Sequence, residues 1–265
     1  MKKLALALYR FIFLHPILIK FNYTIYLFSL RGIGILNHED KKISGEEYLL
    51  RRLSSKKKDA VIFDVGANVG EYSKLCKELV PGCILYAFEP HPKTFQRLLE
   101  NSKGNNFIPV NAALDKTSGR AVLFDYASQD GSSHASLYSN VITEFHESQA
   151  MSVETETLSL DDFMDARGVE KIDLLKIDTE GNEYPVLLGA KNAIKNGKIK
   201  IIQFEFSQLN IANRNFLKDF YDLLPEYDFY RLFPGTLFPL GKYDAAKYEI
   251  FLFQNIVAVS KNYFL

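Results

Sequence analysis

Acidic side chains stand near the ends of two apolar segments of this chain, in positions where they could accept a proton. Asp178 and Glu180 follow the apolar part of "LLKIDTEG", and Glu205 lies near the end of "KIIQFEF". Side chains two residues apart on a strand point to the same face, so Asp178 and Glu180 share a pocket if the strand is still extended there. Neighbouring carboxylates raise one another's pKa, which suits one of them as a general base. We therefore predict that Asp178, Glu180 and Glu205 are catalytic residues.

Each of these carboxylates also has a structural interpretation. Asp178 would hold backbone amides or the amine of a ligand, Glu180 would cap the helix that begins at "NEYP", and Glu205 would pair with a lysine at the edge of a sheet. A divalent cation held by Asp178 and Glu180 would acidify a bound hydroxyl. No further ligand cluster accompanies these residues in the sequence, so no metal is predicted.

The stretch "VIFDVGANVGEYSKL" is typical of a buried strand, a tight turn and a helix. Gly66 and Gly70 would let the backbone approach a ligand, and the start of the helix would direct free N–H groups toward it. A dinucleotide site needs G-x-G-x-x-G, but Asn68 stands at the position of the second glycine, which disfavours a pyrophosphate. Asp64, just before the turn, instead suits a ligand that carries an ammonium group.

A second carboxylate completes this pattern. Glu89 lies nineteen residues after Gly70, where the next apolar segment ends in "FEP". In an open parallel sheet, an acidic residue at this strand end accepts hydrogen bonds from ribose hydroxyls. One carboxylate beside an amine and another on a ribose describe S-adenosylmethionine, so the sequence predicts this cofactor. A tight strand-to-helix connection that binds nothing is the alternative.

The segments that must position these residues alternate between apolar runs and helical periodicity, which predicts a doubly wound α/β sheet with helices on both faces. Strands are predicted at "VIFDVG", "CILYAFE" and "FIPVNAAL", separated by helices at "EYSKLCKELV" and "PKTFQRLLENSKG", the latter capped by Gly104. The segments "RAVLFDYA" and "MSVETETL" predict an inserted β segment around a serine-rich loop.

The alternation resumes after the insertion. Further strands are predicted at "IDLLKID", "KIIQFEF", "DFYRLF" and "YEIFLFQNIVAVS". Helices are predicted at "LDDFMDARG", "PVLLGAKNAIKNG" and "NFLKDFYDLLPEY". No internal repeat interrupts this order.

The first thirty residues are rich in Leu, Ile, Phe and Tyr. The longest uncharged run, Phe11 to Ile19, is shorter than the ~20 residues that cross a bilayer, and Pro16 interrupts it. We predict that residues 1–31 form two short amphipathic helices on a membrane surface. Packing on the protein's own core or in a homodimer is the alternative. Residues 1–58 are predicted to be an arm and linker, and residues 59–265 the catalytic domain.

The composition bears on partners and location. The 265 residues include 32 Lys and Arg and 32 Asp and Glu, so no net field favours a nucleic acid, and none is predicted as a partner. Cys76 and Cys83 have no metal-ligand spacing and no disulfide framework, which predicts packed thiols in a reducing cytosol. We expect a cytoplasmic protein held through its arm at the inner face of a membrane.

The motifs "FDVGANVGEYS", "FEPHP", "GSSHASL", "LLKIDTEGNEYPVLLGA" and "IIQFEFS" follow one another in an order that resembles the FkbM family of S-adenosylmethionine-dependent methyltransferases. The similarity covers about residues 59–260. It implies a seven-stranded methyltransferase sheet of Rossmann-like type, with the last strand inserted antiparallel. It also implies methyl transfer to oxygen, commonly a sugar hydroxyl in a glycan or natural product.

The resemblance places the cofactor contacts at the first two strand ends, and Asn111 at the third strand end is implied to contact the adenine. The predicted cofactor-binding residues are Asp64, Gly66, Ala67, Asn68, Gly70, Glu89, Pro90, His91 and Asn111. In the serine-rich loop, Ser132, Ser133 and His134 are predicted to bind the substrate; a merely flexible loop is the alternative. Either His91 or His134 would also serve as a base near neutral pH.

These observations predict an O-methyltransferase that uses S-adenosylmethionine to modify a hydroxyl of a sugar, a glycan precursor or a glycosylated natural product. Two alternatives remain. The acceptor would be a lipid-linked or other small-molecule hydroxyl, or the chain would be a non-catalytic binding protein with a methyltransferase fold. The intact set of Asp64, Gly66, Gly70 and Glu89 argues against the last alternative.

Overall fold

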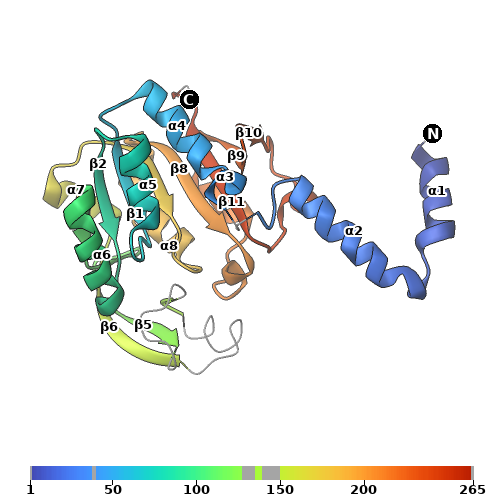
Figure 1. Ribbon diagram of the computed structural model, residues 1–265, viewed down its shortest axis with the longest axis horizontal. Helices are drawn as coiled ribbons and strands as arrows, with labels where there is room; N and C mark the ends of the chain where they lie inside the picture. The colour runs from blue at the N-terminus through green and yellow to red at the C-terminus, as the bar shows by residue number, and fades with distance from the viewer. Residues whose placement is uncertain (1, 38–39, 127–134, 139–149, 264–265) are drawn as a thin grey trace.

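The computed structural model describes residues 2–37, 40–126, 135–138 and 150–263 (Figure 1). Its centre is an eight-stranded sheet in the order β10-β9-β11-β8-β7-β1-β2-β3. The strands are β1 (Val61–Val65), β2 (Ile84–Phe88), β3 (Ile108–Val110), β7 (Ile172–Ile177), β8 (Ile199–Phe206), β9 (Tyr227–Phe233), β10 (Thr236–Pro239) and β11 (Gln254–Ser260).

The pairing confirms the predicted doubly wound sheet. Strands β3, β2, β1, β7 and β8 are parallel neighbours, and β11 lies antiparallel between β8 and β9. The predicted number of seven strands was wrong, because β10 adds an eighth strand at the edge, antiparallel to β9. This segment, "TLFP", is short, largely exposed and ends in a proline, so it lacks the continuous apolar pattern of a central strand.

Helices cover both faces of the sheet because successive strand residues point to opposite sides. Ile62 packs with α4 (Glu46–Lys56), α5 (Glu71–Leu79) and α6 (Pro92–Asn105). The neighbouring residue, Phe63, packs on the other face, where the core is completed by α7 (Leu160–Arg167), α8 (Glu183–Leu188), α9 (Lys191–Lys195) and α10 (Leu217–Leu223). Cys76 and Cys83 are buried free thiols, as predicted.

A second sheet has three strands, in the order β4-β6-β5. Strands β5 (Gly119–Tyr126) and β6 (Ala150–Leu158) pair antiparallel, which confirms the predicted insertion, and β4 (Ala113–Leu114) pairs parallel with β6. The predicted strand "FIPVNAAL" is therefore divided, because β3 belongs to the large sheet and β4 to the small one.

Three other boundaries were predicted wrongly. The helix expected over "PVLLGAKNAIKNG" is two short helices, α8 and α9. Helix α6 continues through Gly104 to Asn105, and the next residue, Asn106, takes the left-handed cap conformation with φ of 53°. The long last strand begins only at Gln254, because a short helix, α11 (Ala245–Tyr248), and an irregular segment precede it.

The N-terminal segment consists of an exposed arm and a packed part. The arm comprises α1 (Lys2–Phe13), a 3-10 turn at Pro16–Leu18 and α2 (Ile19–Gly32), and it projects away from the sheet (Figure 1). In α4, by contrast, Leu49, Leu50 and Leu53 are fully buried in the core, after a single turn of helix at α3 (Lys41–Ser44). The domain boundary after residue 58 stays a prediction. It assigns α4 to the N-terminal segment, although α4 packs in the same core as β1.

In the described part of the chain, no single helix has the length and apolar character of a membrane span. Residues 3–13 and 16–32 reach that combination only as a pair, across a bend of 93°.

Candidate functional site

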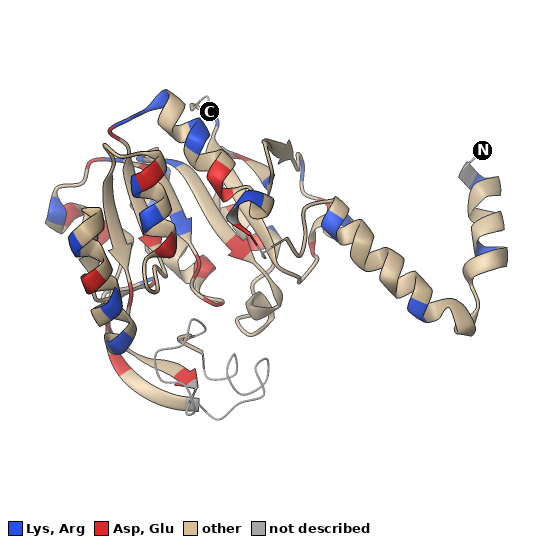
Figure 2. Ribbon diagram, viewed as in Figure 1, with Lys and Arg blue, Asp and Glu red and all other residues tan. Residues whose placement is uncertain are grey.

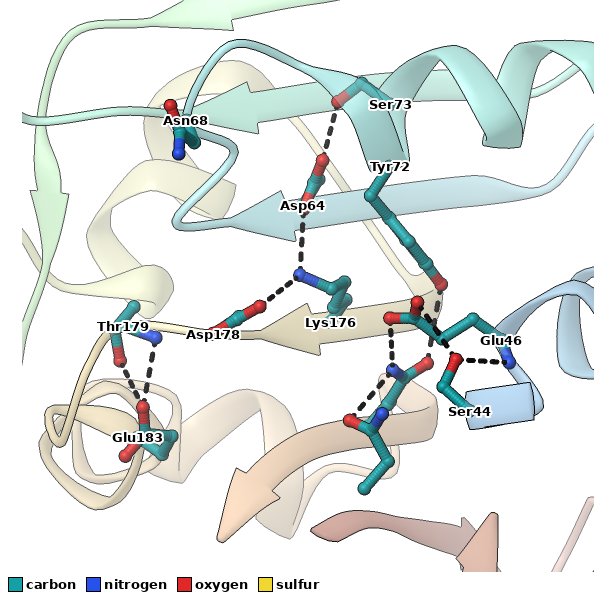
Figure 3. A network of polar contacts seen from close by, with 12 residues as sticks. Ser44, Glu46, Asp64, Asn68, Tyr72, Ser73, Lys176, Asp178, Thr179 and Glu183 are labelled. Atoms are coloured by element: carbon teal, nitrogen blue, oxygen red, sulfur yellow. Dashed lines mark hydrogen bonds and ion pairs between the residues drawn. The ribbon is translucent and has the colours of Figure 1, made fainter. Parts of the chain in front are cut away.

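Asp64 lies on β1 directly before the glycine turn and is completely buried. Its Oδ2 accepts a hydrogen bond of 2.7 Å from the Ser73 hydroxyl, which places the start of α5 against the strand. Its Oδ1 lies 3.7 Å from Nζ of Lys176 on β7. Asp64 therefore lies beside an ammonium group, as we expected for this carboxylate, but the ammonium group is that of Lys176 and not of a ligand (Figure 3).

The two glycines of the turn make room for neighbouring protein atoms, and their predicted contact with a ligand stays a prediction. A Cβ on Gly66 would lie 1.7 Å from the carbonyl oxygen of Asp178, and a Cβ on Gly70 would lie 2.8 Å from Cδ1 of Leu98. Both glycines also have φ above 80°, where an L side chain is strained. The glycines thus allow β1, β7 and α6 to pack closely at the edge of the sheet where the site lies.

Glu89 follows β2 and is only 6% exposed. Its carboxylate accepts hydrogen bonds from the backbone N–H groups of Asn68, at 2.9 Å, and His91, at 2.8 Å. Burial raises the pKa of Glu89 to about 7, although these two hydrogen bonds act in the opposite direction. The remaining lone pairs of the carboxylate are available to a ligand in the adjoining cavity.

Two cavities meet at Gly66, Asn68 and Asp178, above the carboxyl ends of β1 and β7. The first encloses about 550 Å³ of space; Glu89, Pro90 and Glu180 also line it, together with apolar residues, among them Phe88, Leu114, Leu123 and Leu137. The second encloses about 510 Å³ and is polar; its other walls include Asp64, Ala67, Glu46, Tyr72 and Lys176. Most of the predicted cofactor-binding residues therefore lie around two adjoining spaces.

Lys176 is the residue in this region that the sequence analysis missed. Its ammonium lies 3.1 Å from Oδ2 of Asp178 as well as near Asp64, and 4.9 Å from the centre of the Tyr72 ring. Burial alone lowers the pKa of this lysine, but the negative charges of Asp178, Asp64 and Glu46 outweigh burial and raise it. The lysine is thus a fixed positive charge between carboxylates, and a charged residue within an otherwise apolar strand is the sequence signal that points to it.

A polar chain connects this lysine pocket to the helix that precedes β1. The Tyr72 hydroxyl donates a hydrogen bond to Oε1 of Gln203, and Nε2 of Gln203 donates one of 3.1 Å to Glu46 (Figure 3). Glu46 also accepts a hydrogen bond from Ser44. Helix α4, which lies within the residues predicted to be a helical arm and linker, therefore supplies one wall of the second cavity.

Asp178 and Glu180 line the same cavity, but not in the way that we predicted. Strand β7 ends at Ile177, and Glu180 adopts a left-handed conformation with φ of 53°, so a turn and not an extended strand brings them together. The turn is built around Glu183. Oε1 of Glu183 accepts hydrogen bonds from the backbone N–H groups of Thr179 and Gly181.

Glu183 is 2% exposed, and its second carboxylate oxygen accepts a hydrogen bond from the amide of Asn210. Burial raises its pKa to about 7. The sequence analysis also missed this residue, because a glutamate just inside a helix start is usually a solvated one. The N-cap residue of α8, whose first residue is Glu183, is Asn182 and not Glu180.

Glu205, on β8, belongs electrostatically to the same group. Burial raises the pKa of Glu205 well above its usual value, and the negative charges of Asp178, Glu180 and Glu183 raise it further. The three predicted catalytic carboxylates are therefore close enough to influence one another. Glu205 does not line either of the two cavities, as far as their described walls show.

Two predicted cofactor residues have structural contacts instead. The amide of Asn111 donates hydrogen bonds to the backbone carbonyls of Glu89 and Pro90, so it fastens the turn after β2. His91 is 1% exposed, and its Nε2 lies 3.5 Å from Oδ2 of Asp125 on β5. Neither residue lines the two cavities among the residues described, so a direct contact with the cofactor stays a prediction.

The predicted substrate residues Ser132, Ser133 and His134 lie outside the described residues. The adjacent segment, residues 135–138, is described. The Ser136 hydroxyl donates a hydrogen bond to the carbonyl of Glu180, and Ala135 and Leu137 line the first cavity. The end of the serine-rich loop therefore adjoins the turn that carries two of the predicted catalytic carboxylates.

The described residues contain no group of three or more His, Cys, Asp or Glu side chains that could hold a metal ion.

Comparison with known proteins identifies the family. Residues 64–230 match the model of the methyltransferase FkbM domain, which covers more than half of the chain. The chain belongs to the FkbM family of methyltransferases. In this FkbM methyltransferase the matched region starts at Asp64 and ends within β9, so it contains Lys176 and the predicted catalytic carboxylates but not Glu46, the arm or β11.

Three relatives of this FkbM methyltransferase illustrate the range of the family. Hexuronic acid methyltransferase AglP of Haloferax volcanii is 31% identical over 166 residues, which cover 62% of this chain and 64% of that protein. The 2-O-methyltransferase NoeI of Sinorhizobium fredii is 28% identical, with 67% and 76% covered. The 31-O-demethyl-FK506 methyltransferase FkbM of Streptomyces tacrolimicus is 26% identical, with 50% and 60% covered.

Proposed function

We propose that this methyltransferase uses S-adenosylmethionine to methylate a hydroxyl of a sugar, either in a glycan precursor or in a glycosylated product. The observation that carries the proposal is the pair of adjoining cavities, one with an apolar wall and Glu89, the other with Asp64 and Lys176. The names of two relatives support the acceptor class, since one acts on hexuronic acid and another is a 2-O-methyltransferase.

The residues present fit the two ends of this cofactor. Phe88, Leu114 and Leu123 form an apolar wall suited to an adenine ring, and the Glu89 carboxylate suits the ribose hydroxyls beside it. In the polar cavity, the Lys176 ammonium suits a carboxylate, while Asp64 and Asp178 suit an amine. When bound, the cofactor supplies a methyl group carried on a sulfonium.

The chain itself must orient the acceptor and take its proton. A hydroxyl placed beside the turn of residues 178–180 would lie next to Asp178 and Glu180, with Glu205 behind them on β8. The raised pKa of Glu205 makes its ionised form a better proton acceptor than an exposed carboxylate. The proton of the acceptor oxygen then passes to one of these three carboxylates as the new O–C bond forms.

Activity should distinguish these three residues. Asp178→Asn, Glu180→Gln and Glu205→Gln each keep the size of the side chain, and loss of the general base should lower turnover by about 10²- to 10⁴-fold. The two variants that do not remove the base should fall by much less, and only Asp178→Asn should also weaken binding of the cofactor, because Asp178 lines the polar cavity. Full activity in all three variants would remove the base from this cluster.

The acceptor class can be tested with the full-length protein and methyl-labelled S-adenosylmethionine. We expect calorimetry to show binding of the cofactor, and mass spectrometry to show one added methyl group on uronic acid or hexose acceptors. A folded sample with no affinity for S-adenosylmethionine would contradict the choice of cofactor. Transfer only to lipid-linked or other non-sugar hydroxyls would contradict the sugar as acceptor.

A further inference from the structure

The arm carries the most exposed large apolar side chains of the described chain. Phe11, Leu14 and Ile17 are 89%, 80% and 82% exposed, and all three lie at the corner between α1 and α2. Other large apolar side chains along both helices are exposed to a lesser extent, from 38% at Ile25 to 77% at Leu4; they are Leu4, Leu6, Leu8, Ile12, Ile19, Phe21, Tyr23, Ile25, Tyr26, Leu27 and Phe28. Scattered apolar residues are normal on a protein surface, but a contiguous set of this size marks an interaction site.

Specific contacts hold the corner between the two helices. The Tyr9 hydroxyl donates a hydrogen bond of 2.9 Å to the side chain of Asn22, whose amide in turn donates one to the carbonyl of Phe13. The Phe13 ring stacks on Tyr9 and on Phe21, with ring centres 4.8 and 5.7 Å apart. The bend of 93° therefore has its own hydrogen bonds and ring contacts, which present Phe11, Leu14 and Ile17 to the outside.

The charges of the arm have a single sign. The sequence has no Asp or Glu before Glu39, and Figure 2 shows blue but no red along both helices. Lys3 and Arg10 are seven residues apart and therefore lie on the same side of α1. On α2, Lys20 and Arg31 are eleven residues apart, again on one side of the helix. Lys3 with Arg10, and Lys20 with Arg31, thus place positive charges along one side of each helix.

The apolar surface of α2 is too wide for a single protein contact. Ile19, Tyr23 and Tyr26 lie on one side of this helix, and Phe21 and Phe28 lie on the opposite side. A helix that docks in a groove or pairs with a second copy presents one apolar stripe, whereas a helix that is apolar nearly all round needs an apolar medium. Both apolar sides of α2 are exposed in this chain.

We propose that residues 3–32 bind the surface of an anionic lipid bilayer, with the corner at Phe11, Leu14 and Ile17 inserted deepest. Apolar burial and attraction between basic side chains and anionic headgroups add together in such a position. The root of the arm is anchored to the catalytic domain, because Leu30 is buried and Arg231 donates a hydrogen bond to the carbonyl of Ile33. The catalytic domain is therefore held beside the lipid surface.

Vesicle flotation with the full-length protein tests this proposal. We expect the protein to float with vesicles of phosphatidylglycerol and phosphatidylcholine at low salt, and less so at high salt or with phosphatidylcholine alone. The variant Phe11→Ser, Leu14→Ser, Ile17→Ser should bind more than about a hundredfold more weakly, since each large apolar side chain contributes at least about tenfold when buried. The matched control makes the same change at the exposed residues Ile84, Ile211 and Phe238 and should bind like the parent.

A charge variant makes the second comparison. Replacing Lys3, Arg10 and Lys20 by Gln should weaken binding to anionic vesicles by about fivefold per removed charge. The same change at Lys93, Arg97 and Lys103 on α6 is the control and should have no effect. Failure of the parent protein to float with anionic vesicles at low salt would overturn the proposal. So would a dimer in the absence of lipid that the three serine substitutions dissociate, because it would show that a second copy covers the arm.

Discussion

At the scale of single residues, the pKa of Glu89 connects cofactor binding to pH. Because burial raises this pKa to about 7, the carboxylate gains a proton as the pH falls through 7 and loses its ability to accept charge-assisted hydrogen bonds from the ribose. We expect the dissociation constant of S-adenosylmethionine to increase below pH 7, by at most about a factor of 10 per pH unit. Calorimetry across this range measures the effect.

Glu89→Gln provides the control for that experiment. The amide oxygen still accepts a backbone hydrogen bond but carries no titratable proton, so binding should be weaker by about 1.5 to 3 kcal/mol at pH 8 and nearly independent of pH. An unchanged pH dependence in Glu89→Gln would assign the proton to another group.

Replacing Lys176 should lower the free energy of unfolding by more than the loss of a single surface charge would. Replacing it by Met removes the positive charge and leaves the buried Asp64 and the partly buried Asp178 without compensation. Removing one partner of a buried ion pair costs about 3 to 5 kcal/mol, which urea denaturation would measure as a lower midpoint. Lys195→Met, on the surface of α9, is the matched control, and equal effects of the two substitutions would contradict a buried ion cluster.

The sequence identified Asp64, Glu89, Asp178, Glu180 and Glu205 because acidic residues after apolar strands are conspicuous. It did not identify Lys176 or Glu183, since their importance depends on partners that only the fold brings near. Lys176 meets Asp64 from a strand more than a hundred residues away. The positions of Gly66 and Gly70 were evident, but their close packing was not, because the atoms that they accommodate come from Asp178, directly after β7, and from Leu98 on α6.

At the scale of elements, the contact between β1 and the turn after β7 sets the edge of the site. Gly66→Ala would place a Cβ 1.7 Å from the Asp178 carbonyl in a conformation with φ of 81°, so the two elements must separate. We expect a loss of more than about 3 kcal/mol of stability together with loss of cofactor binding, measured by thermal melting with and without cofactor.

Gly104→Ala, near the end of α6, is the matched control for this substitution. A Cβ at this position meets nothing within 4 Å, and alanine favours a helix over glycine by about 1 kcal/mol. This variant should melt at the same temperature as the parent or higher. A similar loss in both variants would contradict a specific role for the contact at Gly66.

Glu183 makes the stability of the turn at residues 178–181 depend on pH. Its pKa is about 7 in the folded protein and near 4.5 in the unfolded chain, so the folded protein holds this proton more tightly. The resulting stabilisation is complete below about pH 4.5 and is lost as the pH rises through 7, a change of about 3 kcal/mol. Glu183→Gln should remove this part of the pH dependence, which denaturation at several pH values would measure. An unchanged slope would contradict the assignment.

The types of the elements were predictable, because apolar runs and helical periods alternate clearly along this chain. The residues at which the elements end were not predictable. The helix over "PVLLGAKNAIKNG" breaks at Gly189, where a Cβ would lie 2.1 Å from the Asp115 carbonyl. The strand over "FIPVNAAL" divides between two sheets. Both features depend on tertiary contacts that a local pattern does not contain.

At the scale of the whole molecule, we expect the residues before Leu30 to contribute almost nothing to the stability of the catalytic domain, whereas Leu30 and Ile35 contribute to it. A chain that begins at Ser29 keeps Leu30 and Ile35, which are 2% and 0% exposed, and should unfold at the same denaturant concentration as the parent. A chain that begins at Lys41 loses both side chains and should be less stable by about 3 kcal/mol or more. Equal stability of the two shortened chains would show that the root of the arm contributes nothing to the domain.

The position of β11 has a consequence for the order in which the protein is completed during synthesis. Residues 254–260 are synthesised after both of their neighbours in the sheet, β8 and β9, so the antiparallel pair of β9 and β10 cannot join β8 until β11 has been made. The root of the arm is fastened equally late, because the N–H of Leu36 donates a hydrogen bond to the carbonyl of Phe253, directly before β11. The arm is thus synthesised before the strand that fastens its root, and under the proposed membrane binding it would be free to meet a lipid surface before the sheet is complete. A chain truncated before Gln254 would expose the unpaired edges of β8 and β9, which are sites for aggregation.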